Sequence, residues 1–303
     1  MTAADRKTTS RAPAPGGTAQ LAGGTVARIG FGAMQLEQRA VGRDTALAIL
    51  RLAISAGVNH IDTAHFYGAC NTFIHDALAP YPEDLVLVGK VGADRDAGGK
   101  LVPAQRPEQL RAQIEADLAT LGAGQVGVVN LRRLDARPGL IAEGDQRVDL
   151  DSQLAELAAL RDAGKIGAVG LGNVSASQLR QALPAGIACV QNAYSLLDRS
   201  AEPVLELCRE HDIAWVPFFP FGSGFPNRPR ATGSPTVVGI AGELGATPAQ
   251  VALAWLLAHY DNTLLIPGTS DPAHLAENIA AGSLRLPRAS VTALNQLPTP
   301  DMS

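Results

Sequence analysis

The stretch that decides the fold is Leu85-Val86-Leu87-Val88-Gly89-Lys90, an apolar run that ends on a lysine. Residues 107–121 after it form an amphipathic stretch with a proline in its first turn, where the fixed φ and missing N–H of proline suit a helix start. A second apolar run follows at residues 126–131. Strand, helix and strand in this order predict two parallel strands covered by the helix that connects them.

The same alternation extends in both directions from this unit. We expect strands at residues 28–32, 58–62, 85–90, 126–131, 166–171, 188–191, 213–218 and 264–266. We expect helices near residues 71–78, 107–121, 154–162, 177–182, 201–211 and from about Pro272 onward. Eight strands favour the α/β class with a closed (β/α)8 TIM barrel over an open doubly wound sheet. The open sheet would need GxGxxG after its first strand, and Gly30-Phe31-Gly32-Ala33-Met34 does not supply it.

The chain divides into a leader and a single domain. Residues 1–20 are rich in Ala, Thr, Pro and Gly and lack the apolar core of a signal peptide, so we expect a disordered leader there. Residues 21–303 are expected to form the barrel. The Gly- and Pro-rich segment 220–235 is expected to be a long, functional loop after a strand, because the alternation resumes beyond it.

Composition and charge argue against several classes of protein. Of the 303 residues, 46% are hydrophobic and 18% are charged, which fits a globular chain with a large core. The net charge of −4 argues against a nucleic-acid binder, and no apolar run reaches the roughly 18 residues of a membrane span. The three cysteines are widely spaced, so neither a disulfide framework nor a zinc site is expected. We therefore expect a cytoplasmic protein without a bound metal, whose oligomeric state is open.

Polar side chains stand at the predicted ends of three consecutive strands, where barrel enzymes hold their catalytic groups. Asp62 ends the second strand with Tyr67 just beyond it, Lys90 ends the third strand and Arg132 ends the fourth. A tyrosine hydroxyl keeps its proton near neutral pH, because its ordinary pKa is about 10. A lysine stabilises the phenolate that proton donation leaves behind, and a carboxylate holds the lysine. Asp62, Tyr67 and Lys90 therefore predict proton transfer to or from a substrate oxygen.

From Val26 to about Leu297 the chain resembles the aldo-keto reductase family. The resemblance rests on residues 30–34, the Asp-Thr-Ala-x-x-Tyr-Gly run of 62–68, Lys90, residues 170–173, 191–195 and 266–270, and the pair Glu277-Asn278. It implies a (β/α)8 oxidoreductase that transfers hydride from NADPH to an aldehyde or ketone, with Tyr67 as general acid. NADH is the open alternative. Gly268 and His274 stand where relatives that prefer the 2′-phosphorylated cofactor often carry Lys and Arg.

The resemblance also implies which residues lie around the cofactor and the substrate. The side-chain amides of Asn173 and Gln191 would hold the nicotinamide carboxamide, and Phe218, or Phe219 in a shifted alignment, would stack on the ring. The other positions implied for the cofactor are Gly32 and Asp62, then Gly222, Ser223 and Gly224 in the loop over the pyrophosphate, and Thr269, His274, Glu277 and Asn278, of which Thr269, Glu277 and Asn278 fall at the adenosine end. The substrate pocket is expected to include Met34 and His65.

Arg132 departs from the family pattern, because many relatives carry a histidine at this position. A histidine can titrate near pH 7, whereas an arginine stays charged and donates hydrogen bonds in a fixed fork. We hypothesise that Arg132 orients the substrate and stabilises negative charge that develops on its oxygen. The alternative is that Arg132 turns away and pairs with Asp135.

Several functions are compatible with these residues. The leading one is an NADPH-dependent reductase of a small aldehyde or ketone, and an enzymatic alternative is a reductase of pyridoxal or a similar aromatic aldehyde. A non-catalytic alternative is a cofactor-binding regulatory subunit, like the auxiliary channel subunits of the same family. Asp62, Tyr67 and Lys90 favour an enzyme, because a binding protein needs no proton relay. The physiological substrate depends on loop shape, which has no readable code in the sequence.

Overall fold

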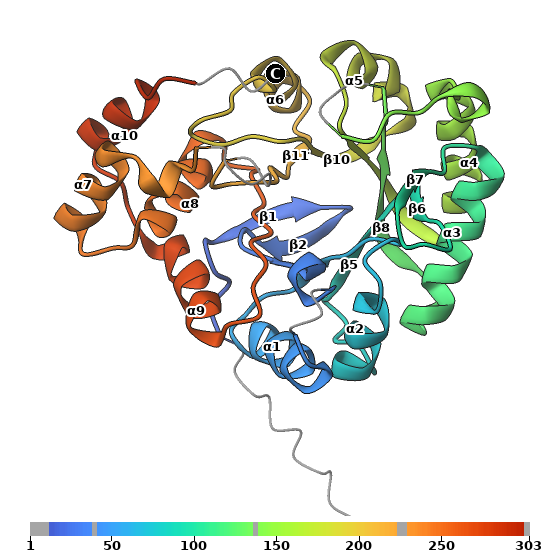
Figure 1. Ribbon diagram of the computed structural model, residues 1–303, viewed down its shortest axis with the longest axis horizontal. Coiled ribbons are helices and arrows are strands. Elements are labelled where there is room, and N and C mark those ends of the chain that lie inside the picture. The colour runs from blue at the N-terminus through green and yellow to red at the C-terminus, as the bar shows by residue number, and fades with distance from the viewer. Residues whose placement is uncertain (1–11, 38–40, 136–138, 223–228, 300–303) are drawn as a thin grey trace, which may run out of the picture.

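Parallel strands form the centre of the molecule (Figure 1). The computed structural model describes residues 12–37, 41–135, 139–222 and 229–299. Every neighbouring pair of strands in the main sheet is parallel, as predicted. In order across this sheet the strands are β11 (Ala214–Trp215), β10 (Ile187–Gln191), β9 (Ile166–Gly172), β8 (Val126–Arg132), β5 (Val86–Val91), β4 (His60–Asp62) and β3 (Phe31–Gly32).

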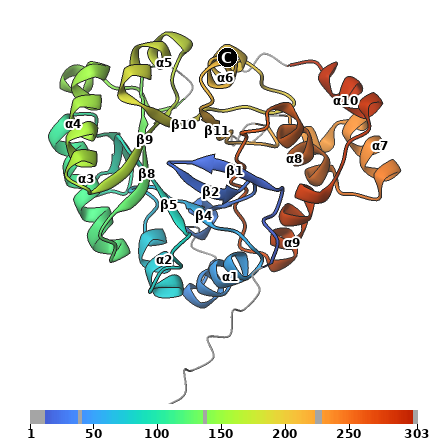
Figure 2. The ribbon, with the colours of Figure 1, turned by 180° about the vertical axis from the view of Figure 1, so that it is seen from behind.

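The sheet closes on itself through an eighth extended segment at residues 263–265. Ile29 forms a parallel bridge with Leu265, and Trp215 forms one with Thr263. Backbone hydrogen bonds of 2.7 to 3.0 Å run along both of these seams. The predicted (β/α)8 barrel is therefore confirmed, and Figure 2 shows the ring of elements from behind. The first and last strands are shorter than predicted, because only a few of their residues pair with a neighbour.

Helices cover the outside of the barrel (Figures 1 and 2). Their bounds are α1 (Arg43–Ser55), α2 (Cys70–Leu78), α3 (Pro107–Leu121), α4 (Leu150–Asp162), α5 (Ala176–Ala182), α6 (Glu202–Glu210), α7 (Pro235–Leu244), α8 (Pro248–His259), α9 (Pro272–Ala280) and α10 (Arg288–Asn295). The predicted helix at 107–121 has the observed bounds of α3. Helix α4 begins four residues earlier than predicted, because Asp149 caps it by accepting a hydrogen bond from Ser152 N at 2.8 Å.

An antiparallel hairpin of β1 (Thr18–Leu21) and β2 (Gly24–Ala27) lies within the ring of strands (Figure 1). The predicted disordered leader of residues 1–20 is thus too long, since residues 12–20 are ordered and end in this strand. The physical reason is that alternate apolar side chains of the hairpin fill the amino-terminal end of the barrel. These side chains, Ala19, Leu21 and Val26, belong to one buried cluster with Val88, Val128, Cys189, Ala214, Val216 and Leu264.

A second hairpin, which the strand and helix pattern did not predict, follows β5 on the carboxyl side of the barrel. It consists of β6 (Ala93–Arg95) and β7 (Leu101–Pro103), which are antiparallel. Arg95 donates from Nε to the Phe66 carbonyl oxygen at 2.9 Å and also contacts Glu37. The hairpin is therefore fastened to the loops that follow β3 and β4.

The long loop predicted at residues 220–235 lies where the sequence indicated. An antiparallel bridge joins Gly222 to Arg230, and α7 begins at Pro235. Residues 223–228 lie outside the described part of the chain. Within the described ranges, no single helix is long and apolar enough to cross a membrane. Helices α7 and α8 reach that length only together, across a bend of 93°.

Gly32 is required where β3 meets the closing segment of the barrel. A Cβ at this position would lie 2.5 Å from the Ile266 carbonyl oxygen. We expect Gly32→Ala to lower the free energy of unfolding by about 2 kcal/mol, because a backbone oxygen cannot move aside without shifting the strand. Urea denaturation measures this change. The control is Gly242→Ala in α7, where a Cβ meets nothing within 4 Å; it should raise the free energy of unfolding by about 1 kcal/mol. If Gly32→Ala and Gly242→Ala both lowered the free energy of unfolding, the close approach to the Ile266 carbonyl oxygen would not be the cause.

His60 is expected to make the fold sensitive to acid. Its ring fills the space in front of Gly30, and burial lowers the pKa of His60 from 6.5 to about 4. The unfolded chain binds this proton at higher pH than the folded chain does. The stability that the neutral ring provides above pH 6.5 is therefore lost as the pH falls toward 4. The total loss in the free energy of unfolding is about 3 kcal/mol.

Urea unfolding between about pH 7 and about pH 4 measures the slope of stability against pH. We expect His60→Gln to be less stable at neutral pH but to have a shallower slope in this window. The exposed His211→Gln serves as the control and should keep the original slope. A slope that His60→Gln leaves unchanged would assign the acid sensitivity to another group.

Candidate active site

The carboxyl ends of β4, β5 and β8 bring three of the predicted residues to one end of the barrel. Asp62, the last residue of β4, pairs with Val88 of β5. Lys90 lies two residues further along β5 and pairs with Asn130 of β8. Arg132 lies two residues beyond Asn130, at the end of β8. Side chains two residues apart share one face of a strand, so this stagger turns the acid and both cations toward the barrel interior.

Asp62 and Lys90 form a buried ion pair. Lys90 Nζ donates to Asp62 Oδ1, and it also donates to the Thr63 carbonyl oxygen at 2.9 Å. Gln191, at the end of β10, donates from Nε2 to the other carboxylate oxygen at 2.7 Å. Burial lowers the pKa of Lys90, but the charges of Asp62 and Tyr67 raise it by more, so the net shift is upward. Lys90 therefore stays charged at neutral pH.

Tyr67 lies directly beside this ion pair. Lys90 Nζ is 5.1 Å from the centroid of the Tyr67 ring, and the Phe66 ring meets Tyr67 edge-on at 5.2 Å. Burial raises the pKa of Tyr67, while the positive charges of Lys90 and Arg132 lower it, and the net shift is upward. The charge of Lys90 therefore lowers the pKa of Tyr67, as predicted, but burial raises this pKa by more. Tyr67 keeps its proton at neutral pH and can serve as an acid.

Arg132 faces this group without an acidic partner among the described residues. Its guanidinium lies 5.5 Å from the centroid of the Phe66 ring. Burial lowers the pKa of Arg132, and the nearby Tyr67 opposes that shift. A cation that is half-buried and unpaired gains strongly from a bound anion or a polarised carbonyl. The position therefore suits contact with a substrate oxygen.

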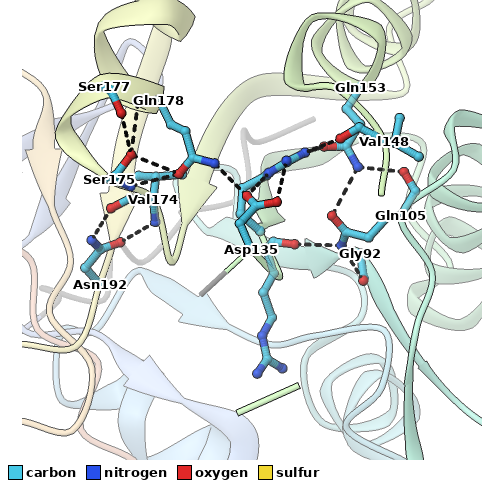
Figure 3. Close-up of polar contacts among 12 residues, drawn as sticks. Gly92, Gln105, Asp135, Val148, Gln153, Val174, Ser175, Ser177, Gln178 and Asn192 are labelled. Atoms are coloured by element: carbon cyan, nitrogen blue, oxygen red, sulfur yellow. Dashed lines mark hydrogen bonds and ion pairs between the residues drawn. The ribbon is translucent and has the colours of Figure 1, made fainter. Parts of the chain in front are cut away.

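The alternative partner for Arg132, Asp135, is engaged by the next residue instead. Arg133 donates from Nε and Nη2 to the two Asp135 oxygens at 2.7 and 2.8 Å, and it also contacts Gln153 on α4. Gln178 on α5 donates to Asp135 at 2.5 Å (Figure 3). The alternative of an Arg132–Asp135 pair is thus wrong, because successive strand residues point to opposite faces and Arg133 is the one that faces the helices.

Gln105 supports the backbone of Arg132, and the sequence analysis missed it. Its Nε2 donates to the carbonyl oxygens of Gly92 at 2.6 Å and Arg132 at 2.9 Å. Gln153 in turn donates to the Gln105 carbonyl oxygen at 2.6 Å (Figure 3). Gln105 belongs to the short irregular segment before α3, so no periodicity or motif marks it as a support of the site.

The residues predicted for the nicotinamide end lie at the ends of β9, β10 and β11. Asn173 is exposed, has a left-handed φ of 55°, and donates from its backbone N–H to the Gln191 carbonyl oxygen at 3.0 Å. Phe218 is half-buried and meets Phe219 edge-on at 5.0 Å. Phe219 has a φ of 57°, an unusual conformation for an aromatic residue. Asn173 therefore presents an exposed side-chain amide next to the backbone of Gln191, whose own amide is buried and donates to Asp62.

The residues predicted for the other end of the cofactor lie just before α9 and along it. Thr269 and Asn278 are buried, Glu277 is half-buried and His274 is exposed. Gly32 packs against the same segment, since a Cβ on it would meet the Ile266 carbonyl oxygen. Gly222 has a φ of 110°, and the predicted residues Ser223 and Gly224 lie outside the described part of the chain.

Asp271 is a neighbour of these residues that the sequence analysis missed. Its carboxylate caps α9 by accepting from Ala273 N at 2.8 Å, and its own N–H donates to Thr269 Oγ1 at 3.0 Å. His274 Nδ1 lies 3.8 Å from the same carboxylate. The start of α9 thus already holds a negative charge, which opposes a second anion there.

The two residues predicted for the substrate pocket differ in their surroundings. Met34 lies in a short 3-10 helix, Ala33–Glu37, and 40% of it is exposed, so it is free to contact a ligand. The backbone of His65 lies against the ion-paired lysine, since its N–H donates to the Lys90 carbonyl oxygen at 3.1 Å, but its ring is turned toward α3. Its Nδ1 lies 2.8 Å from Asp117 Oδ1 on α3, on the helix side of the sheet. That His65 lines the substrate pocket therefore stays a prediction, since its half-buried ring is held by Asp117 on one side and lies 3.9 Å from Asp94 on the other.

A closed barrel that carries a half-buried tyrosine and lysine and a buried aspartate at its strand ends is the architecture of an enzyme that exchanges a proton with a substrate oxygen. The sequence profile of the Aldo/keto reductase family matches residues 28–298. The chain belongs to the aldo/keto reductase family and is an oxidoreductase of that family.

Individual relatives agree with this assignment. The chain is 40% identical over 279 residues to pyridoxine 4-dehydrogenase of Escherichia coli (strain K12), covering 89% of this chain and 94% of that protein. It is 30% identical over 280 residues to an uncharacterized oxidoreductase of Schizosaccharomyces pombe, covering 89% and 86%. Among solved structures, an aldo-keto reductase from Klebsiella pneumoniae in complex with NADPH has the same fold, with a TM-score of 0.79, 23% identity, and 94% and 96% of the two chains covered.

Titration of Tyr67 tests the electrostatics of the site without any ligand. The difference in phenolate absorbance between the unchanged protein and Tyr67→Phe should show a midpoint above the ordinary value of about 10. Arg132→Met removes a cation that favours the phenolate while it keeps an apolar stem. It should therefore move the midpoint higher, whereas the exposed Arg180→Met on α5 should not. A midpoint that Arg132→Met lowers or leaves in place would show that its charge does not act on Tyr67.

Proposed function

We propose that this protein is an NADPH-dependent reductase that converts an aldehyde or ketone into an alcohol. The observation that carries the proposal is Tyr67 beside the buried pair of Asp62 and Lys90. The reduced nicotinamide supplies the hydride when it is bound. Tyr67 supplies the proton that the carbonyl oxygen needs as it becomes an alkoxide. Lys90 stabilises the phenolate that results, and Asp62 keeps Lys90 charged and in place.

The residues at the strand ends fit a nicotinamide cofactor. Asn173 exposes an amide at the mouth of the barrel, next to Gln191, and a carboxamide needs both a donor and an acceptor. Phe218 offers a half-buried aromatic side chain in the same region. We assign the carboxamide to Asn173 and Gln191 and the stacking contact to Phe218.

NADPH is the cofactor that we propose, on the basis of the family resemblance. Thr269, Ser270 and His274 would hold its 2′-phosphate. The carboxylate of Asp271 works against this choice, since it already occupies the start of α9. Isothermal binding of both cofactors decides the point, and tighter binding of NADH would overturn the assignment.

Arg132, in the position where many relatives carry a histidine, is proposed to contact the substrate oxygen. It lacks an acidic partner among the described residues and lies near Tyr67, so its fork is available to a ligand. A fixed cation stabilises the negative charge that grows on the carbonyl oxygen as hydride arrives. An arginine fork also binds two neighbouring oxygens at once.

The substrate that we propose is pyridoxal or a similar aromatic aldehyde. One support is the relative named pyridoxine 4-dehydrogenase, at 40% identity over 279 residues. A second support is Arg132, because pyridoxal carries a hydroxyl oxygen on the ring carbon next to its aldehyde. The two oxygens would match the two donors of the arginine fork. A general reductase of small aldehydes and ketones is the broader alternative.

Two aldehydes with and without the neighbouring hydroxyl test this assignment. The oxidation of NADPH is followed with pyridoxal and with pyridine-4-carbaldehyde, which lacks that hydroxyl. We expect Arg132→Ala to lower kcat/KM for pyridoxal by about 100-fold and for pyridine-4-carbaldehyde by about 10-fold, because the second charged hydrogen bond exists only in pyridoxal. Arg132→His should recover more of the activity on the simpler aldehyde than on pyridoxal.

Three outcomes are informative. Equal losses on both aldehydes would support a general carbonyl reductase. Unchanged turnover in Arg132→Ala would remove Arg132 from the substrate site. Tight NADPH binding without any oxidation over a panel of aldehydes would overturn the enzyme in favour of a cofactor-binding regulatory subunit.

A further inference from the structure

A buried carboxylate lies behind the active site, on the helix side of the barrel wall. Asp117 belongs to α3 and is 5% exposed. It lies behind β5, since a Cβ on Gly89, the neighbour of Lys90, would be 4.0 Å from Asp117 Oδ2. Neither proton transfer nor cofactor binding uses it in the function proposed above. An aliphatic residue would pack a helix against a strand at lower cost, because a buried carboxylate must be compensated by hydrogen bonds.

Two side chains compensate this carboxylate, one from the loop after β4 and one from the first turn of α2. Asn71 Nδ2 donates to Asp117 Oδ1 at 2.9 Å, and His65 Nδ1 lies 2.8 Å from the same oxygen. Burial raises the pKa of Asp117, while the contacts with His65 and Asn71 lower it, and the net shift is upward. Burial lowers the pKa of His65, but the contact with Asp117 and the charge of Asp94 together raise it by more. Each partner therefore stabilises the ionised form of the other.

Asn71 also joins the two ends of the loop that carries Tyr67. Thr63 follows directly on β4, and its hydroxyl donates to Asn71 Oδ1 at 2.8 Å. Asn71 lies in the first turn of α2, so the hydrogen bond joins the start of the loop to its end. Residues 63–71 are thereby closed into a short ring with Tyr67 near its middle, and Asp117 holds this ring against the barrel wall through two of its members.

This ring also touches the catalytic lysine. Lys90 Nζ donates to the Thr63 carbonyl oxygen at 2.9 Å, and His65 N donates to the Lys90 carbonyl oxygen at 3.1 Å. Within the loop, Tyr67 N donates to the Ala64 carbonyl oxygen at 3.0 Å. A displacement of Thr63 or His65 would therefore change the separation between Tyr67 and Lys90.

We propose that Asp117 is a positioning residue that, through His65, Asn71 and Thr63, fixes the Tyr67 loop against Lys90. This role rests on the reductase function proposed above, since it concerns the approach of the Tyr67 hydroxyl to the substrate oxygen. Small errors in the placement of a reacting group lower the rate much more than they lower binding. The loss of one of these hydrogen bonds should accordingly appear in kcat.

Thr63 gives the sharpest test, because one variant removes the hydroxyl that reaches Asn71 and another keeps it. Thr63→Val keeps the shape and loses the hydroxyl, whereas Thr63→Ser keeps it. We expect Thr63→Val and Asp117→Asn to lower kcat about tenfold, with KM for the aldehyde and Kd for NADPH changed by less than about twofold. Thr63→Ser should stay near the original kcat. Thr292→Val, at an exposed threonine on α10, serves as the matched control and should change nothing.

Amide hydrogen exchange gives a readout that does not depend on catalysis. The amides of His65, Tyr67 and Cys70, which are bonded within the loop or to Lys90, should exchange faster in Thr63→Val and Asp117→Asn. The amide of Val190 in β10 should not change. If the unchanged protein reduces no aldehyde, the proposed function fails, but the exchange experiment still tests the ring.

Three results would overturn the positioning role. The first is unchanged exchange in the loop of both variants. The second is a kcat that Thr63→Val leaves intact, and the third is an equal loss of kcat in Thr63→Ser. If Asp117→Asn does not fold, the Thr63 pair decides the question, because it leaves the buried carboxylate and its partners in place.

Discussion

The ion pair between Asp62 and Lys90 is the interaction on which the rest of the site depends. A lysine that is taken out of water keeps its charge only if an anion and further acceptors replace the lost hydration. Asp62 and the Thr63 carbonyl oxygen supply them, and Gln191 holds the carboxylate from the opposite side. Removal of one partner would leave an uncompensated charge inside the barrel, at a cost of about 3 to 5 kcal/mol. The positions of β4, β5 and β10 are thus coupled through a single buried charge pair.

Features set by short-range patterns could be predicted from the sequence. Apolar runs separated by amphipathic stretches gave the barrel, and the proline that opens α3 marked the start of that helix correctly. The juxtaposition of Asp62, Tyr67 and Lys90 followed from the same logic, because the carboxyl ends of parallel strands meet at one end of a barrel. These three residues needed only the strand order and the alternation of faces.

Features set by contacts between distant parts of the chain could not be predicted. The first residues of the β1–β2 hairpin, 18–20, fall in the predicted leader, and they are ordered because the open end of the barrel accepts the apolar side chains of the hairpin. The direction of His65 depends on Asp117, which lies 52 positions away in the chain. Whether Arg132 or Arg133 faces the interior depends on strand register, and a change of one residue would exchange their environments.

The hairpin at the amino-terminal end has an electrostatic consequence for the opposite end. Its apolar side chains, with Val88, Val128 and Cys189, form an apolar floor beneath the ion pair. A charge above such a floor is screened weakly from below and more strongly from the open mouth. The field of Lys90 is therefore asymmetric along the barrel axis and is concentrated toward Tyr67 and Arg132. In this way the apolar floor, although far from any reacting atom, sets the direction in which the charge of Lys90 acts.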